Sequence, residues 1–272
     1  MLALLVGMLL VGAGMAALLS ADDGDASAQQ RIVGAPDAVD DAGTFTYQMT
    51  ISSKNGSTTG QVTLDGAVDS RAKRSKASLQ TGGQTLDMVT DAKFLYVRVP
   101  DHAKSTTNGK GWAKVDGAAL GGGVGGISSD PNPMQSFEQL RRAGSDVEDL
   151  GTEEVRGATT THYRTVLDLG RGLDRLGGTT ASEAAALREQ LSAVPVDVWL
   201  DGHDRVRRQR TTLELTMPAT SGAAPSRTRV TSTVEAFDFG KPVSIDRPAA
   251  DDVHEGGGIP GLQSLFSASK TD

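Results

Sequence analysis

Alternation of apolar and polar residues is the feature that most restricts how this 272-residue chain can fold. Residues 45–51 read FTYQMTI, in which every second side chain is large and apolar. A period of two is typical of a β-strand with one buried face and one hydrated face. An Asn-Gly turn signal follows at residues 54–57, and residues 61–64 resume the pattern. The stretch therefore predicts a β-hairpin.

Further short segments rich in alternating, β-branched and aromatic residues follow this hairpin. Turn residues such as aspartate, asparagine and glycine separate them. The expected strands span residues 76–81, 84–90, 94–99 and 111–115 in the first half, and residues 147–150, 153–155, 160–169, 196–201, 205–217 and 228–237 in the second half. Short connections favour pairing of consecutive strands, so the first half predicts an antiparallel meander.

Two segments have the spacing of amphipathic helices. Residues 130–133 read DPNP, which suits the first turn of a helix, and apolar side chains then follow at helical spacing as far as Gly144. A second helix is expected over about residues 180–191, with Leu187 on its apolar stripe.

A glycine-rich segment without a period, residues 116–130, predicts a mobile loop. Gly121, Gly123 and Gly126 match the spacing of a dinucleotide-binding motif. No clear strand precedes them and no helix begins at their end, so this motif does not indicate a nucleotide site.

A cluster of titratable residues raises the question of a metal or acid/base site. Asp197, Asp201, His203 and Asp204 fall within eight positions, and several arginines follow. The apolar residues on both sides alternate, so the cluster lies at a hairpin turn, and the other histidines lack ligand spacing. We therefore favour a structural turn, with the arginines on the hydrated face of the returning strand. A metal or acid/base site remains the alternative.

Residues 2–19 form an uncharged apolar run, intermediate in length between a signal-peptide core and a membrane span, so export is expected. No basic residue precedes the run, so we expect the natural start to lie upstream of Met1 or to differ from it. Ala26-Ser27-Ala28 has the form of a cleavage site. Residues 1–28 are thus expected to be a cleaved signal peptide or an N-terminal membrane anchor, and both remain open. Residues 29–43 read as a polar linker and residues 256–272 as a flexible tail.

Composition excludes several functions. The chain has no cysteine, which rules out disulfides, a thiolate nucleophile and a cysteine-ligated zinc. The net charge of −7 comes from interspersed signs and gives no basic footprint for nucleic acid. No hydrolase motif is present, and no histidine lies beside a candidate nucleophile. We therefore expect a protein that is not an enzyme and that uses no cofactor or metal.

The order of these elements resembles that of the actinobacterial LppX/LprG-type envelope lipoproteins, which share the fold of the LolA and LolB lipoprotein carriers. The most specific matching pieces are GTEEVRGATTTHYRTVLDL at residues 151–169 and VPVDVWLDGHDRVRR at residues 194–208, followed by a closing strand at residues 237–253. The resemblance covers about residues 44–255, which we take as one domain. The acylated cysteine of that family is absent here, so any attachment to a membrane would have to be through residues 2–19.

The resemblance implies an α+β fold in which a strongly curved antiparallel sheet, an unclosed half-barrel, wraps around a few helices. In that family an apolar cavity between sheet and helices holds the acyl chains of lipids or glycolipids that move through the cell envelope. The alternating apolar faces of the strands suggest which residues would line such a cavity here: Tyr47, Met49, Val62, Leu64, Leu86, Met88, Val198, Leu213 and Leu215. The expected helices add Phe137 and Leu140 from the first and Leu187 from the second.

Two functions remain open at this point. The first is an extracytoplasmic protein that binds or carries lipid, held at the cell membrane or secreted to the envelope, with a membrane transporter as a further partner. The second is an envelope sensing or protein-interaction domain whose core is filled by its own side chains. A roomy apolar cavity would favour the first function, and a cavity too small for an acyl chain would favour the second.

Overall fold

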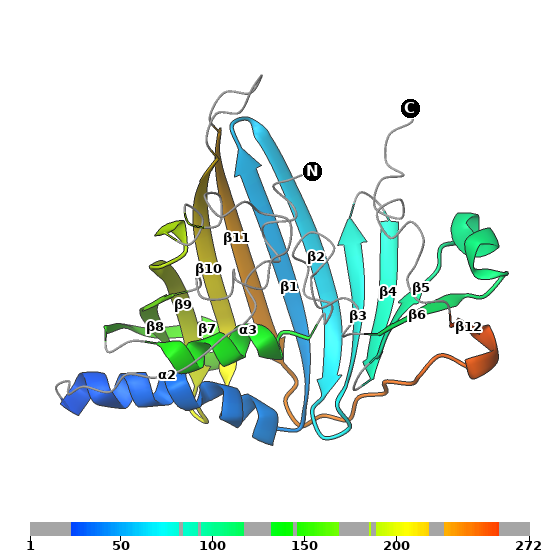
Figure 1. The fold of residues 1–272 in the computed structure, drawn as a ribbon. Coiled ribbons are helices and arrows are strands. Elements are labelled where there is room, and N and C mark those ends of the chain that lie inside the picture. Colours follow the sequence, from blue (N-terminus) through cyan, green and yellow to red (C-terminus); the bar gives the residue numbers. More distant parts are fainter. Residues whose placement is uncertain are drawn as a thin grey trace.

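The computed structural model of the chain describes residues 23–81, 84–91, 94–116, 132–143, 146–168, 185, 189–217 and 226–255. Their strands form a 12-stranded sheet in the order β12-β6-β5-β4-β3-β2-β1-β11-β10-β9-β8-β7. The sheet curves without closing, and two helices, α2 and α3, lie on its inner side (Figure 1). The expected α+β fold with a curved, unclosed and mostly antiparallel sheet is therefore confirmed.

The first half is the expected meander, in which each strand pairs antiparallel with the one before it. The first two strands pair along their whole length, from Thr44 opposite Asp69 to Asn55 opposite Thr58. Gly56 lies in the turn between them with φ 57°, a conformation that glycine adopts without a steric penalty. The strands are β1 (Thr44–Asn55), β2 (Thr58–Asp69), β3 (Arg74–Thr81), β4 (Gln84–Asp91), β5 (Phe94–Arg98) and β6 (Trp112–Asp116), and a 3-10 helix η1 (Asp101–Thr107) precedes β6.

The second half forms another antiparallel run, and its last strand pairs with β1 to join the two halves. The two segments expected at 147–150 and 153–155 are one strand, whose register shifts between Asp149 and Thr152. Gly151 lies in this bulge with φ 93°. The strands are β7 (Val147–Val155), β8 (Ala158–Leu167), β9 (Val194–Asp201), β10 (Val206–Met217) and β11 (Ser226–Phe237).

The segment after β11 differs from the closing strand expected at residues 237–253. The chain has no strand from residue 238 until β12 (Val253–His254), which follows a 3-10 turn η5 (Ala250–Asp252) and pairs parallel with β6. Two prolines, Pro242 and Pro248, lack the N–H groups that a sheet ladder requires. The segment instead packs on the sheet, where buried Ile245 joins a small apolar cluster that includes Val89 and Tyr96.

Residues 29–43 do not form the linker that their polar composition suggested. Helix α2 (Asp23–Asp41) covers most of this range and leads almost directly into β1. Ala28, Ile32, Ala35 and Val39 are buried at spacings of three and four, so one side of the helix faces the core. The folded body therefore begins well before residue 44.

The helix expected after residue 133 is confirmed as α3 (Met134–Glu138) followed by the 3-10 turn η3 (Gln139–Arg142). Residues 2–19, residues 117–131, most of the helix expected at 180–191 and the tail at 256–272 lie outside the described residues. Among the helices of the described ranges, none is both long enough and apolar enough to span a bilayer.

Candidate functional site

The concave face of the sheet carries a continuous apolar surface. Met49 of β1 lies opposite Val234 of β11 on one side and Leu64 of β2 on the other. The row continues in register through Leu79 of β3 to Leu86 of β4. Residues in register project from the same face of a sheet, so this row crosses five strands on one side. The row belongs to the same hydrophobic cluster as Ile32 of α2 and Phe137 of α3, so it lies on the side that these helices cover.

The residues proposed from the sequence as cavity lining gather on this face. Leu187 lies outside the described residues, and the other eleven all belong to one hydrophobic cluster or pack against it. They are Tyr47, Met49, Val62, Leu64, Leu86, Met88, Phe137, Leu140, Val198, Leu213 and Leu215. The alternation in the sequence therefore predicted a common apolar surface, while the presence of a cavity stays a proposal.

Burial divides these eleven residues into two groups. Seven of them are at most 3% exposed, namely Tyr47, Leu64, Phe137, Leu140, Val198, Leu213 and Leu215. The other four are only partly buried, and they lie on β1, β2 and β4: Met49, Val62, Leu86 and Met88. Helix α2 contacts β7, β9 and β10, and η3 contacts β8, so the helices cover the other half of the sheet. The partly buried group therefore marks the part of the concave face that the described helices cover least.

A second apolar cluster extends this surface toward β6, the strand next to the short edge strand β12. Leu95, Val97 and Val115 are buried together, and the partly buried Leu86 and Met88 pack against this cluster as well as the main one. The apolar concave surface thus reaches from β6 to the helices. The cavity-lining residues proposed from the sequence did not include residues 95–99, although this segment, LYVRV, alternates apolar residues as the chosen strands do.

Helix α2 is fixed on the concave side by polar contacts at two places. Arg31 donates hydrogen bonds to Asp204, at 2.6 Å, and to the hydroxyl of Tyr163, at 2.5 Å. Farther along the helix, Asp37 accepts two hydrogen bonds from Arg141 of η3, at 2.7 and 2.8 Å. The sequence proposal missed this helix altogether, although Ile32, Ala35 and Val39 already have helical spacing.

The acidic cluster between β9 and β10 forms the hairpin turn that its sequence indicates. Asp201 is 5% exposed and accepts hydrogen bonds from the backbone N–H groups of His203 and Arg205 and from the guanidinium groups of Arg205 and Arg207. Burial raises the pKa of Asp201, but these hydrogen bonds outweigh it and hold the pKa below the ordinary value. Asp204 occupies the left-handed region with φ 58° and points to Arg31. Each acidic group at the turn thus has a structural role.

Metal coordination finds no support in this cluster. No group of three or more histidine, aspartate or glutamate side chains within the described ranges has the geometry to hold a metal ion. Both oxygens of Asp201 already accept hydrogen bonds, as a carboxylate at a turn commonly does.

A separate polar cluster lies on the convex face of β7, β8 and β9. His162 stacks on the ring of Trp199 at 4.0 Å and contacts Glu153 and Asp197 at 2.9 and 3.1 Å. The hydrogen bond from the Trp199 indole is the main reason that the pKa of Glu153 lies below its ordinary value. Every member of the cluster has a partner, so the arrangement ties three strands together and leaves no unpaired nucleophile or base.

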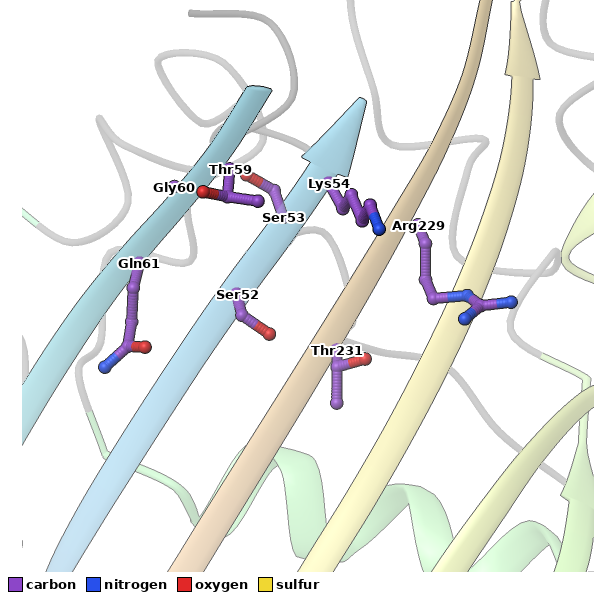
Figure 2. A pocket seen from close by; sticks show the side chains of 8 residues that line it. All are labelled: Ser52, Ser53, Lys54, Thr59, Gly60, Gln61, Arg229 and Thr231. Carbon is purple, nitrogen blue, oxygen red and sulfur yellow. The ribbon is translucent and has the colours of Figure 1, made fainter. Parts of the chain in front are cut away.

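The convex face also carries a polar groove near the tip of the β1–β2 hairpin. Ser52 lies opposite Gln61 of β2 and Thr231 of β11, and these side chains project from neighbouring strands (Figure 2). The groove has a volume of about 380 Å³ and is lined by Ser52, Ser53, Lys54, Thr59, Gly60, Gln61, Arg229 and Thr231. Each lining side chain ends in a hydroxyl, amide or cationic group, whereas the side chains of the concave face are apolar, so the concave face is the better candidate site for an acyl chain.

No protein-family model matches the sequence. A 31.2 kDa protein of Streptomyces griseus, from the rplA-rplJ intergenic region, is 29% identical over 188 residues. The match covers 62% of this chain and 58% of the relative. The chain thus spans little more than half of that relative.

The solved structures that resemble the chain include mycobacterial lipoproteins. The lipoprotein LppX of Mycobacterium tuberculosis matches with a TM-score of 0.52 and 16% identity, over 82% of this chain and 100% of LppX. LprF of Mycobacterium bovis matches with a TM-score of 0.46 and 13% identity, over 83% of this chain and 98% of LprF. The resemblance to LppX-type lipoproteins is therefore confirmed at the level of the fold.

Proposed function

We propose that this chain, which has the fold of the lipoprotein LppX, binds or carries lipid or glycolipid acyl chains on the concave side of its sheet. The observation that carries the proposal is the apolar surface from β1 to β6, where Met49, Val62, Leu86 and Met88 are only partly buried. A sheet that curves around apolar side chains on one face is suited to hold a flexible chain away from water.

The energetics of acyl burial are sufficient without any catalytic group. Each methylene removed from water contributes about 0.8 kcal/mol, so ten methylenes would contribute about 8 kcal/mol before the cost of ordering is subtracted. Methionine side chains adapt their shape to an irregular ligand, and Met49 and Met88 both lie at the partly buried part of the surface.

Export to the cell envelope is part of this proposal. The apolar run at residues 2–19 supports a signal peptide or a membrane anchor, and the lipoprotein fold supports an extracytoplasmic location. A carrier in this setting would receive its cargo from, or deliver it to, a membrane and would work with a membrane transporter.

A filled-core interaction domain remains a second candidate because of one observation. Seven of the proposed lining residues are almost completely buried by the protein itself, as the members of an ordinary core are. In this function the fold would present its loops to a protein partner, and no lipid would enter the concave side.

Native mass spectrometry with lipid extraction separates the two candidates. The chain would be purified from an actinobacterial host and, in parallel, from a host that lacks actinobacterial glycolipids. We expect near-stoichiometric lipid from the first host. A lipid-free mass from both hosts, together with no uptake of a fluorescent fatty acid, would exclude the carrier function and favour the interaction domain.

Two substitutions at adjacent positions test where the lipid binds. Met49→Trp would fill the partly buried concave surface and reduce lipid uptake. Thr50→Trp adds similar bulk on the opposite face, since successive side chains of a strand point to opposite sides, and is the matched control. Equal effects of both substitutions would contradict binding on the concave face.

A further inference from the structure

Part of the apolar concave side carries uncharged polar side chains, and we call this part the concave polar patch: Ser136, Gln139, Thr165, Gln209 and Thr211. Three of its members are almost inaccessible, with Thr165 1%, Gln139 2% and Gln209 2% exposed. Glutamine is mostly found at protein surfaces, so two buried glutamines on one apolar face require an explanation.

The strand register places the patch on the same face as the apolar row. Gln209 of β10 lies between Val198 of β9 and Val234 of β11. Thr211 and Thr165 lie on either side of Val196, one on β10 and the other on β8. These residues therefore face the helices.

The helical part of the patch comes from α3 and η3. Gln209 Nε2 donates a hydrogen bond to Ser136 Oγ, at 3.1 Å, which ties α3 to β10. Gln139 follows Ser136 by one helical turn, and η3 contacts β8, the strand that carries Thr165. The patch thus lies between the helices and strands β8 to β10.

Three buried atoms of the patch have no hydrogen-bond partner in the described part of the chain. They are Gln139 Nε2, Gln209 Oε1 and Thr165 Oγ1. Buried polar atoms in folded proteins nearly always have a partner, because an unpaired one is costly. Apolar side chains of similar size would avoid this cost, so three such atoms in one patch require partners from outside the described part of the chain.

We propose that the concave polar patch binds a neutral hydrogen-bonding group on the cargo, an ester carbonyl next to a hydroxyl, as in a monoacylglycerol. This inference rests on the proposed lipid-binding function and specifies the class of lipid. Gln139 Nε2 donates to the ester carbonyl, Gln209 Oε1 accepts from the hydroxyl, and Thr165 Oγ1 can do either. None of the five side chains is charged, so the patch does not favour a carboxylate or a phosphate over a neutral group.

The test compares three probes that share an eighteen-carbon chain in displacement of a fluorescent apolar dye. Monoolein has the ester and hydroxyls, methyl oleate has the ester alone, and 1-octadecene has neither. Gln139→Leu and Gln209→Leu keep the size of the side chain and remove its polar group. Gln80→Leu makes the same change at an exposed position of β3 and is the matched control.

We expect each patch variant to weaken monoolein binding by about tenfold, the effect of one lost hydrogen bond, and to leave 1-octadecene binding unchanged. Gln139→Leu should also weaken methyl oleate binding, whereas Gln209→Leu should not. Gln139→Leu should unfold at the same denaturant concentration as the wild type or a higher one, because an unpaired polar atom is removed. Gln209→Leu also loses the hydrogen bond to Ser136, so its stability is measured separately and its binding is compared at a denaturant-free condition in which it is folded.

Two results would overturn the inference in different ways. Equal affinities of the wild type and the patch variants for monoolein, with all three probes bound, would exclude the polar anchor and leave lipid binding intact. Failure of the wild type to bind any of the three probes would contradict the proposed function itself.

Discussion

Gly66 provides a direct test of how the concave side is packed. A Cβ atom added at Gly66 of β2 would lie 2.5 Å from the backbone oxygen of Lys76 and 2.5 Å from the hydroxyl oxygen of Tyr47. Tyr47 is 1% exposed, so its ring has little room to move away. Gly66→Ala must therefore displace either the β3 backbone or a buried ring.

Overpacking of this kind costs about 1–3 kcal/mol. Alanine restricts the unfolded chain more than glycine does, and this lower entropy of the unfolded state stabilises the fold by about 0.4–1 kcal/mol. We therefore expect Gly66→Ala to lower the free energy of unfolding by about 1–2 kcal/mol. In a domain of this size each kcal/mol lowers Tm by about 2–4 °C.

Urea unfolding followed by circular dichroism measures this effect. Gly34→Ala is the control, since nothing lies within 4 Å of the added Cβ in helix α2 and alanine is the better helix former. In a Tyr47→Leu background the penalty of Gly66→Ala should fall by at least about 0.5 kcal/mol, because the two residues are in contact. A Gly66→Ala protein as stable as the wild type, or a penalty independent of Tyr47, would refute the packing described here.

Three further predictions concern the turn and helix α2. Asp201→Asn should lower the free energy of unfolding by about 2–4 kcal/mol in urea, because the partly buried cations Arg205 and Arg207 lose their buried counter-charge. The pKa of Asp201 is lower in the folded state than its ordinary value of 3.8, so the ionised carboxylate stabilises the fold fully above pH 3.8. This stabilisation is lost as the pH falls through the folded-state pKa. The free energies of unfolding of the wild type and Asp201→Asn should therefore converge in acid. Arg31→Ala should lower the free energy of unfolding by about 1 kcal/mol and speed the amide hydrogen exchange of α2, because the helix loses its hydrogen bonds to Asp204 and Tyr163. Unchanged exchange rates would show that apolar contacts alone hold the helix on the sheet.

The strands of the sheet were predictable because their signal is local. Alternation from Phe45 to Ile51 and the Asn-Gly turn fix both the hairpin and the face that it buries. The same reasoning identified eight apolar strand residues besides Tyr47 that the structure gathers around one cluster. Period two therefore predicted the composition of the concave face.

Helix α2 and the segment at residues 238–252, after β11, were not predictable in this way. In α2, polar residues outnumber apolar ones and Pro36 lies inside the helix, so the few apolar positions gave a weak signal. The segment at residues 238–252 has no period, and its position depends on buried contacts of Ile245 with strands far away in the sequence. The unpaired atoms of Gln139 and Gln209 depend on packing between α3 and β10, which a single sequence does not reveal.

The most direct test of the central claim is photo-crosslinking with a fatty-acyl probe that carries a diazirine in its chain, followed by residue-level mass spectrometry. Binding on the concave side predicts adducts at the partly buried residues Met49, Val62, Leu86 and Met88, which excess unlabelled lipid should suppress. Adducts confined to the polar groove around Gln61, or labelling that excess lipid does not reduce, would contradict the account.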